Sequence, residues 1–262
     1  MTLPAEVIDR IAAELAEADR THSVIPRITA RYPDATVEDS YAIQGVWRDS
    51  QIATGRRLIG RKIGLTSKAM QQATGITEPD YGVMFDDTVY ESGADIPVDH
   101  FSNVRIEVEL AFVLKSPLEG PDCTLDGALA AIDYAVPALE ILNSHIELEG
   151  RTIVDTISDN AAYGAMVLGG VRRRPDEIDL RWVPGLLFKN GEIEETGVAA
   201  GVLNHPATGV AWLANKFHQH GARLEAGEII LAGSFTRPMW VARGDDVLCD
   251  YGPMGTIECR FI

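Results

Sequence analysis

Two glutamates, Glu107 and Glu109, alternate with apolar residues in the run 105–110, RIEVEL. Residues two positions apart in a strand point to the same face, so both carboxylates are expected to project together. The residues that follow, 111–114, are all apolar, which indicates that this strand enters the core. Two carboxylates in such a place repel each other and lose hydration, and a divalent cation would compensate for both effects.

Glu140 is a candidate third carboxylate for the same site. It follows the otherwise apolar residues 134–139, YAVPAL, and a lone glutamate in such a run is difficult to bury without a partner. Alternation also describes an edge strand with one solvated acidic face. The residues alone therefore leave two interpretations of these glutamates open, a metal site and a solvated strand face.

The elements that must position these residues change in character along the chain. Apolar spacing predicts a helix over residues 4–20, and Thr36 with Asp39 predicts a capped helix over 36–47. After about residue 57, short apolar runs broken by Gly, Pro and Asp predict strands. These runs are residues 57–65, 104–114, 164–170, 185–195, 228–235 and 256–262. Asn190-Gly191 predicts a two-residue hairpin turn inside the fourth run.

Helices over Leu125–Ala135 and Pro206–His220 are predicted to interrupt the strands. The expected fold class is therefore α+β and β-rich, with a mixed or barrel-like sheet. We expect a single domain over residues 1–262, with a helical N-terminal segment at 1–56 and a β-rich catalytic core at 57–262. No glycine-rich dinucleotide fingerprint or P-loop follows a predicted strand.

Composition excludes several classes of function. A formal net charge of −16 leaves no basic face for nucleic acid. No apolar run approaches the roughly 18 residues needed to span a membrane. The acidic N-terminal residues do not match a signal peptide, so a cytoplasmic location is expected. Cys123, Cys249 and Cys259 are odd in number and lack a C-x-x-C spacing, so neither a disulfide framework nor a zinc site is expected.

Several motifs together resemble the fumarylacetoacetate hydrolase superfamily. They are Gly60–Ser67, Glu78–Gly82, Arg105–Glu109, Pro137–Glu140 and Ser158–Ala161, extended by Gly201–Pro206 and Gly233–Pro238. The resemblance covers essentially the whole chain in order. Within the superfamily, the chain resembles the hydratase/decarboxylase branch of aromatic meta-cleavage pathways.

The resemblance implies a β-rich core and an Mg2+ or Mn2+ ion held by Glu107, Glu109 and Glu140. It also implies catalytic roles for Lys62 and Asp80. Lys62 lies between apolar residues in a predicted strand, where desolvation would let it lose its proton more easily. Asp80 follows Pro79 in a predicted turn. Members of the family form homo-oligomers, and we expect one here.

Three further residues are expected to bind substrate. Ser158 and Thr66 lie in segments that the resemblance places beside the pocket. Arg237 follows a predicted strand, and its guanidinium suits a second carboxylate of a diacid through bidentate contacts.

The activity implied is the Mg2+-dependent addition of water to a small 2-oxo diacid, a 2-oxo-heptenedioate, during homoprotocatechuate breakdown. Hydration of a five-carbon 2-oxo monoacid and decarboxylation of 4-oxalocrotonate remain open, because they use the same kind of scaffold. Hydrolysis of a carbon–carbon bond is less well matched, because no separate N-terminal β-domain is recognisable. A different class of function, a catalytically silent subunit of an oligomer, is opposed by the intact set of candidate residues.

Overall fold

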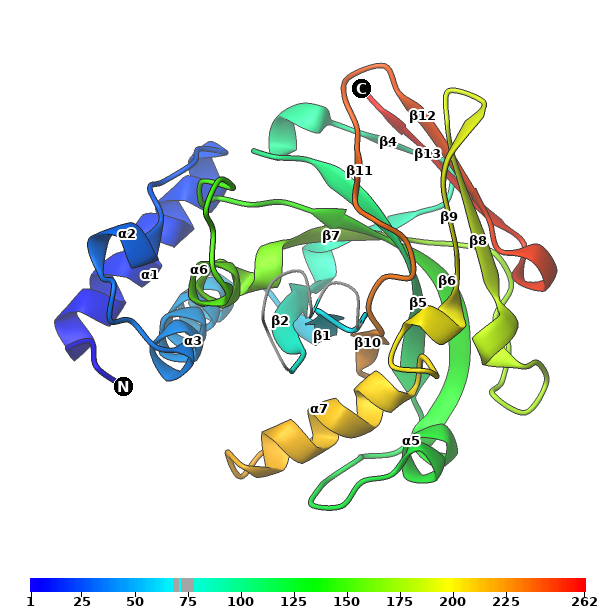
Figure 1. Cartoon of the computed structure of the whole chain (residues 1–262), viewed down its shortest axis with the longest axis horizontal. Coiled ribbons are helices and arrows are strands. Elements are labelled where there is room, and N and C mark those ends of the chain that lie inside the picture. Colours follow the sequence, from blue (N-terminus) through cyan, green and yellow to red (C-terminus); the bar gives the residue numbers. More distant parts are fainter. Residues whose placement is uncertain (68–70, 72–77) are drawn as a thin grey trace.

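Three helices precede the first strand in the computed structural model, which describes residues 1–67, 71 and 78–262 (Figure 1). They are α1 (Ala5–Thr21), α2 (Ile28–Arg31) and α3 (Val37–Ala53). The predicted capping box of α3 is confirmed, since Thr36 and Asp39 bond reciprocally. Buried apolar residues of all three helices pack with Val83 and Phe85, which ties the helical segment to a strand of the core.

The strands form two mixed sheets. The first has the order β2-β1-β10-β5-β6-β7-β3, with β11 beside β5, and the second has the order β4-β13-β12-β8-β9. The strands of the first sheet are β1 (Leu58–Gly64), β2 (Asp80–Phe85), β3 (Val89–Glu91), β5 (Arg105–Leu114), β6 (Ile132–Leu142), β7 (Tyr163–Leu168), β10 (Ile229–Leu231) and β11 (Met239–Trp240). Those of the second are β4 (Ala94–Ile96), β8 (Pro184–Lys189), β9 (Glu192–Val198), β12 (Asp246–Asp250) and β13 (Thr256–Phe261).

The β-rich α+β class is confirmed, but the barrel-like part of the expectation needs correction. Over the described residues, both sheets are open and neither closes on itself. The main apolar cluster draws buried residues from both sheets, for example Val108 and Leu139 from the first and Ile257 and Phe261 from the second. Figure 1 shows the second sheet on the side of the first that lies away from α1 and α3.

The Asn190-Gly191 hairpin between β8 and β9 is confirmed, with positive φ at both turn residues.

The helix predicted over 125–135 was too long. α5 (Leu125–Ala131) ends where Ile132 begins β6, because residues 132–142 pair with β5 over almost their whole length. Local spacing could not reveal that pairing. α6 (Ile153–Ser158) was not predicted, whereas α7 (Thr208–His218) was.

None of the helices formed by the described residues has the length and apolar character needed to cross a membrane. That residues 1–262 form a single domain stays a prediction.

Candidate functional site

Glu107 and Glu140 are direct cross-strand partners in the middle of the first sheet. β5 pairs with β10 on one side and with β6 on the other, and the register sets Glu107 opposite Glu140 and Glu109 opposite Ala138. Side chains directly opposite each other share one face of a sheet, as do residues two apart. All three glutamates therefore project from one face of a central strand pair. The reading as a solvated edge strand is wrong.

The three side chains approach closely enough to share one ion. One carboxylate oxygen from each lies within 4.8 Å of the others. Glu109 and Glu140 are buried, and Glu107 is partly buried. One oxygen of Glu109 and both oxygens of Glu140 accept no hydrogen bond within the described chain. Apart from an ion pair between Lys62 and Glu140, these buried oxygens have no partner in the described part of the chain, and their convergence on one point is a donor set that fits a hard divalent cation.

The pKa values of these glutamates also favour a bound cation. Burial, and then the neighbouring charge of Glu140, raise the pKa of Glu107 to about 7. The same two causes raise the pKa of Glu109 well above its ordinary value. Each carboxylate therefore disfavours the charge of its neighbours, and a cation among them would relieve the repulsion.

Lys62, on β1, reaches the carboxylates from a neighbouring part of the same sheet. Its Nζ lies 3.1 Å from Oε1 of Glu140, and both side chains are almost fully buried. Burial lowers the pKa of Lys62, but the charges of Glu140, Asp80, Glu107 and Glu109 outweigh it, so the pKa is raised overall. The expectation of a readily lost proton considered burial alone. The neighbouring acids therefore favour the protonated form of Lys62.

Asp80 begins β2, directly opposite Gly64 of β1. A Cβ on Gly64 would stand 2.1 Å from Oδ1 of Asp80, so only glycine lets the carboxyl group occupy this place. Asp80 is buried, and its Oδ1 has no hydrogen-bond partner among the described residues. Burial raises the pKa of Asp80, Lys62 opposes that shift, and the charge of Glu140 adds to it. The predicted pair of Lys62 and Asp80 thus shares one electrostatic environment with Glu140.

Thr66 is held near Glu109 by the conformation of Gly233. Gly233 has a φ of +101°, and a Cβ there would stand 2.0 Å from Oγ1 of Thr66. The amide of Gly233 donates a 2.8 Å hydrogen bond to Oε2 of Glu109. This glycine therefore orients one glutamate and leaves room for Thr66 at the same point.

A cavity of about 720 Å3 opens beside these groups, and Thr66, Glu107 and Arg237 all contribute to its lining. Arg237 is exposed, with 81% of its side-chain surface accessible, and its Nη2 lies 2.8 Å from Oε1 of Glu195. Its charge is already matched by an acid of this chain. A substrate-binding role for Arg237 stays a prediction.

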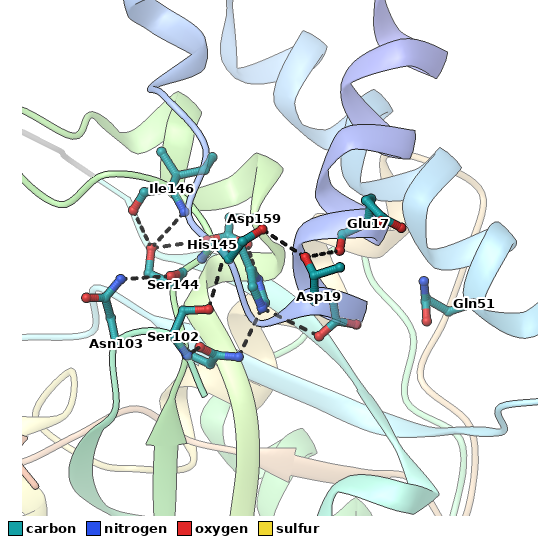
Figure 2. Close-up of polar contacts among 12 residues, drawn as sticks. Glu17, Asp19, Gln51, Ser102, Asn103, Ser144, His145, Ile146 and Asp159 are labelled. Carbon is teal, nitrogen blue, oxygen red and sulfur yellow. Dashed lines mark hydrogen bonds and ion pairs between the residues drawn. The ribbon is translucent and has the colours of Figure 1, made fainter. Parts of the chain in front are cut away.

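Ser158 is buried at the end of α6, and its hydroxyl has no hydrogen-bond partner among the described residues. Within the described residues no hydrogen bond joins it to the three glutamates, so its role also stays a prediction. The next residue, Asp159, is fixed firmly (Figure 2). It accepts hydrogen bonds from the Ser144 hydroxyl, the His145 amide and Nδ1 of His145.

His145 connects this segment to the helical N-terminal part. Its Nε2 lies 3.5 Å from Oδ1 of Asp19, near the end of α1, and Figure 2 shows the ring between Asp19 and Asp159. Burial lowers the pKa of His145, but the hydrogen bond and charge of Asp159 and the charge of Asp19 raise it overall. No sequence motif pointed to this connection, because its members come from three separate segments.

Arg105 is a second residue that the sequence interpretation passed over. It was quoted within the strand motif without a role, although alternation already places it on the face of Glu107 and Glu109.

The family model described as fumarylacetoacetate (FAA) hydrolase C-terminal matches residues 59–262. The chain is 54% identical over 258 residues to 2-oxo-hept-4-ene-1,7-dioate hydratase of Escherichia coli, covering 96% of this chain and 97% of that protein. It is 38% identical over 253 residues to 2-keto-4-pentenoate hydratase of Paraburkholderia xenovorans, covering 97% and 94%. A solved structure of 4-oxalocrotonate decarboxylase from Pseudomonas putida G7, complexed with magnesium and adipate, superposes with a TM-score of 0.97 at 34% identity, covering 100% and 99%. The chain therefore belongs to the fumarylacetoacetate hydrolase family.

Proposed function

We propose that this chain is an Mg2+-dependent hydratase, a hydro-lyase of aromatic catabolism. Its substrate would be 2-hydroxyhepta-2,4-diene-1,7-dioate, the enol form of a 2-oxo-heptenedioate, and its product 4-hydroxy-2-oxoheptanedioate. The observation that carries the proposal is the buried group of Glu107, Glu109 and Glu140 on one face of the β5–β6 pair, beside a cavity.

These three carboxylates would hold the ion, with Glu107 nearest the cavity. A dication bound there would polarise the 2-oxo oxygen and fix the adjacent C1 carboxylate. Mn2+ accepts the same oxygen ligands and is a possible substitute. The amide of Gly233 would keep Glu109 in its coordinating orientation.

The protein's own groups would move the protons. The enol oxygen loses a proton and C5 gains one, which leaves a ketone conjugated with the C3–C4 double bond. Water then adds its hydroxyl to C4, and C3 takes a proton, so the net change is one water gained. Lys62 and Asp80 are the groups that we assign to these transfers, because both are buried beside Glu140 and both can exchange protons.

The relatives support the choice of substrate. The Escherichia coli protein named for the seven-carbon diacid shares more than half of its aligned residues with this chain, whereas the 2-keto-4-pentenoate hydratase shares 38%. The solved decarboxylase binds magnesium together with a diacid, adipate. Decarboxylation of 4-oxalocrotonate is the second candidate, because that enzyme has the same fold at a TM-score of 0.97.

Homo-oligomer formation and a cytoplasmic location are parts of the same proposal. The three cysteines are free thiols, which suits a reducing compartment.

The test is to supply the seven-carbon dienol diacid to the metal-stripped protein, with and without added Mg2+, and to identify the product by mass spectrometry. A product heavier by one water, formed only with Mg2+, supports the hydratase. Loss of CO2 would instead identify a decarboxylase. An unchanged dienol at every Mg2+ concentration would identify a catalytically silent subunit.

A further inference from the structure

Arg105 lies one step along the strand from the three glutamates. Arg105, Glu107 and Glu109 alternate on one face of β5, and Arg105 stands opposite Leu142, the last residue of β6. Two residues of a strand span roughly 6.6 Å. The guanidinium therefore belongs to the same surface as the carboxylates but is displaced toward one end of the strand pair.

The environment of Arg105 holds its guanidinium without neutralising it. The group stacks over the ring of Trp240, 5.2 Å from the ring centroid. Its Nε and Nη2 are buried and have no hydrogen-bond partner among the described residues. Within that part of the chain, no carboxylate comes within ion-pair distance of it either. Donors that are buried, aligned by stacking and unpaired are prepared for an anion that the chain itself does not supply.

A second cation stands at the same end of the strand pair. Arg151 donates from Nη1 to the hydroxyl of Ser144, at 2.9 Å. Ser144 lies two residues beyond Leu142, the partner of Arg105. The positive charge of Arg151 acts on Arg105, while the charges of Glu107 and Glu140 act in the opposite sense. A carboxylate bound beside Arg105 would be attracted by both guanidiniums.

Arg237 does not offer the same opportunity. It is exposed and already paired with Glu195. Arg237 lines the cavity, but Arg105 is the more firmly held guanidinium and has buried donors that are unpaired among the described residues.

We propose that Arg105, with Arg151 beside it, binds the second carboxylate of a 2-oxo diacid whose 2-oxo acid end lies at the three glutamates. This inference rests on the proposed function and names the residues that select a diacid over a monoacid. A guanidinium binds a carboxylate through two parallel hydrogen bonds, and a monoacid would leave those donors unpaired.

The test compares two saturated acids that cannot be hydrated, 2-oxoheptanedioate and 2-oxoheptanoate, by calorimetry at saturating Mg2+. They differ only in the distal carboxylate, so the ratio of their dissociation constants isolates its contribution. For the wild type we expect the diacid to bind roughly 10- to 100-fold more tightly. Arg105→Gln should abolish most of this preference, with a far larger loss of affinity for 2-oxoheptanedioate than for 2-oxoheptanoate. Arg105→Lys, which keeps the charge but loses the paired donors, should give an intermediate ratio.

Two further variants make the outcome decisive. Arg260→Gln is the matched control, because Arg260 is an exposed arginine of the second sheet that is paired with Asp246. Arg237→Gln tests the competing assignment. A wild type without preference, an Arg105→Gln variant that keeps it, or a preference lost through Arg237 instead would each overturn the inference. Failure of the proposed function would give a different result: the wild type would not add water to the dienol diacid, whatever the ratio of the two dissociation constants.

Discussion

Glu107 and Glu140 face each other directly across the β5–β6 pair, where β7 pairs with β6 at Glu140 and where β11 and β10 pair with β5 before and after Glu107. Like charges directly opposite each other destabilise a sheet. Here the ammonium of Lys62 lies 3.1 Å from Glu140, while Glu109 adds a third carboxylate. One lysine cannot balance three carboxylates. As a purely structural feature, this arrangement would lower the stability of the fold, because buried like charges repel each other. As a binding site for a cation, it is explained.

Removal of one ligand should weaken Mg2+ binding severely. Glu140→Gln keeps the shape of the side chain but removes a charged oxygen, and loss of even an outer-shell partner costs about 10- to 100-fold in affinity. We expect a loss of more than about 100-fold by calorimetry, with turnover lost in parallel. Glu258→Gln, an exposed glutamate of β13, serves as the control. Equal Mg2+ affinity in the wild type and Glu140→Gln would exclude Glu140 as a ligand.

Mg2+ binding should strengthen as the pH rises through neutrality. The pKa of Glu107 is raised to about 7 in the folded chain, chiefly by burial and then by Glu140, so its carboxyl group holds a proton below that pH. A metal must displace this proton. Since a raised pKa favours the protonated form, the metal-free fold should also lose stability as the pH rises from about 4.5 to about 7. Calorimetry at pH values on both sides of 7 measures the first effect, and an affinity that falls with rising pH would contradict it.

The sequence predicted which carboxylates lie together better than it predicted the elements around them. Strand alternation placed Glu107 and Glu109 together, since that rule depends only on neighbouring residues. The pairing of Glu107 with Glu140 depends on strand register across an intervening helix, α5, and local pattern could not supply it. For the same reason the helix predicted over 125–135 extended into β6.

The missed residues have a similar explanation. His145 lies between Asp19 and Asp159, residues that are distant from each other in the chain, so only the folded arrangement reveals their connection. The raised pKa of Lys62 likewise depends on acids from β2, β5 and β6 that burial alone does not report.

Lys62 and the metal should compete for Glu140. Lys62→Met removes a positive charge next to a ligand oxygen, so Mg2+ should bind more tightly than to the wild type. Turnover should nevertheless fall by roughly 100- to 10,000-fold, because a proton-transfer group is lost. Calorimetry and steady-state kinetics on the same preparation separate the two effects. Weaker Mg2+ binding together with normal turnover would contradict both parts of this assignment.

Gly233→Ala should damage the site as well as the fold. The φ of +101° costs a non-glycine residue about 1–3 kcal/mol, and the new Cβ would collide with Thr66. Gly55→Ala is a close match, with a φ of +100° and open space around the Cβ position. We expect a larger loss in the free energy of unfolding for Gly233→Ala, together with weaker Mg2+ binding because the amide no longer orients Glu109. If the two variants behaved alike, backbone strain alone would account for the effect.

The His145 connection should stabilise the protein most in mild acid. Its pKa is raised in the folded state, so the added stability is fully present below the unfolded value of about 6.5 and is lost as the pH rises through the folded value. The difference in the free energy of unfolding between the wild type and His145→Asn should therefore be larger near pH 6 than near pH 9. Urea unfolding at the two pH values measures it, and a difference that grew with pH would refute the charge assignment.

The central claim is that Glu107, Glu109 and Glu140 together bind one divalent cation. Anomalous X-ray scattering from crystals soaked in Mn2+ tests it most directly, because the signal locates the ion without reference to activity. The expected result is a single strong peak about 2.0–2.2 Å from an oxygen of each glutamate. The claim would be contradicted if crystals of an active preparation showed a strong peak elsewhere and no peak at these three carboxylates.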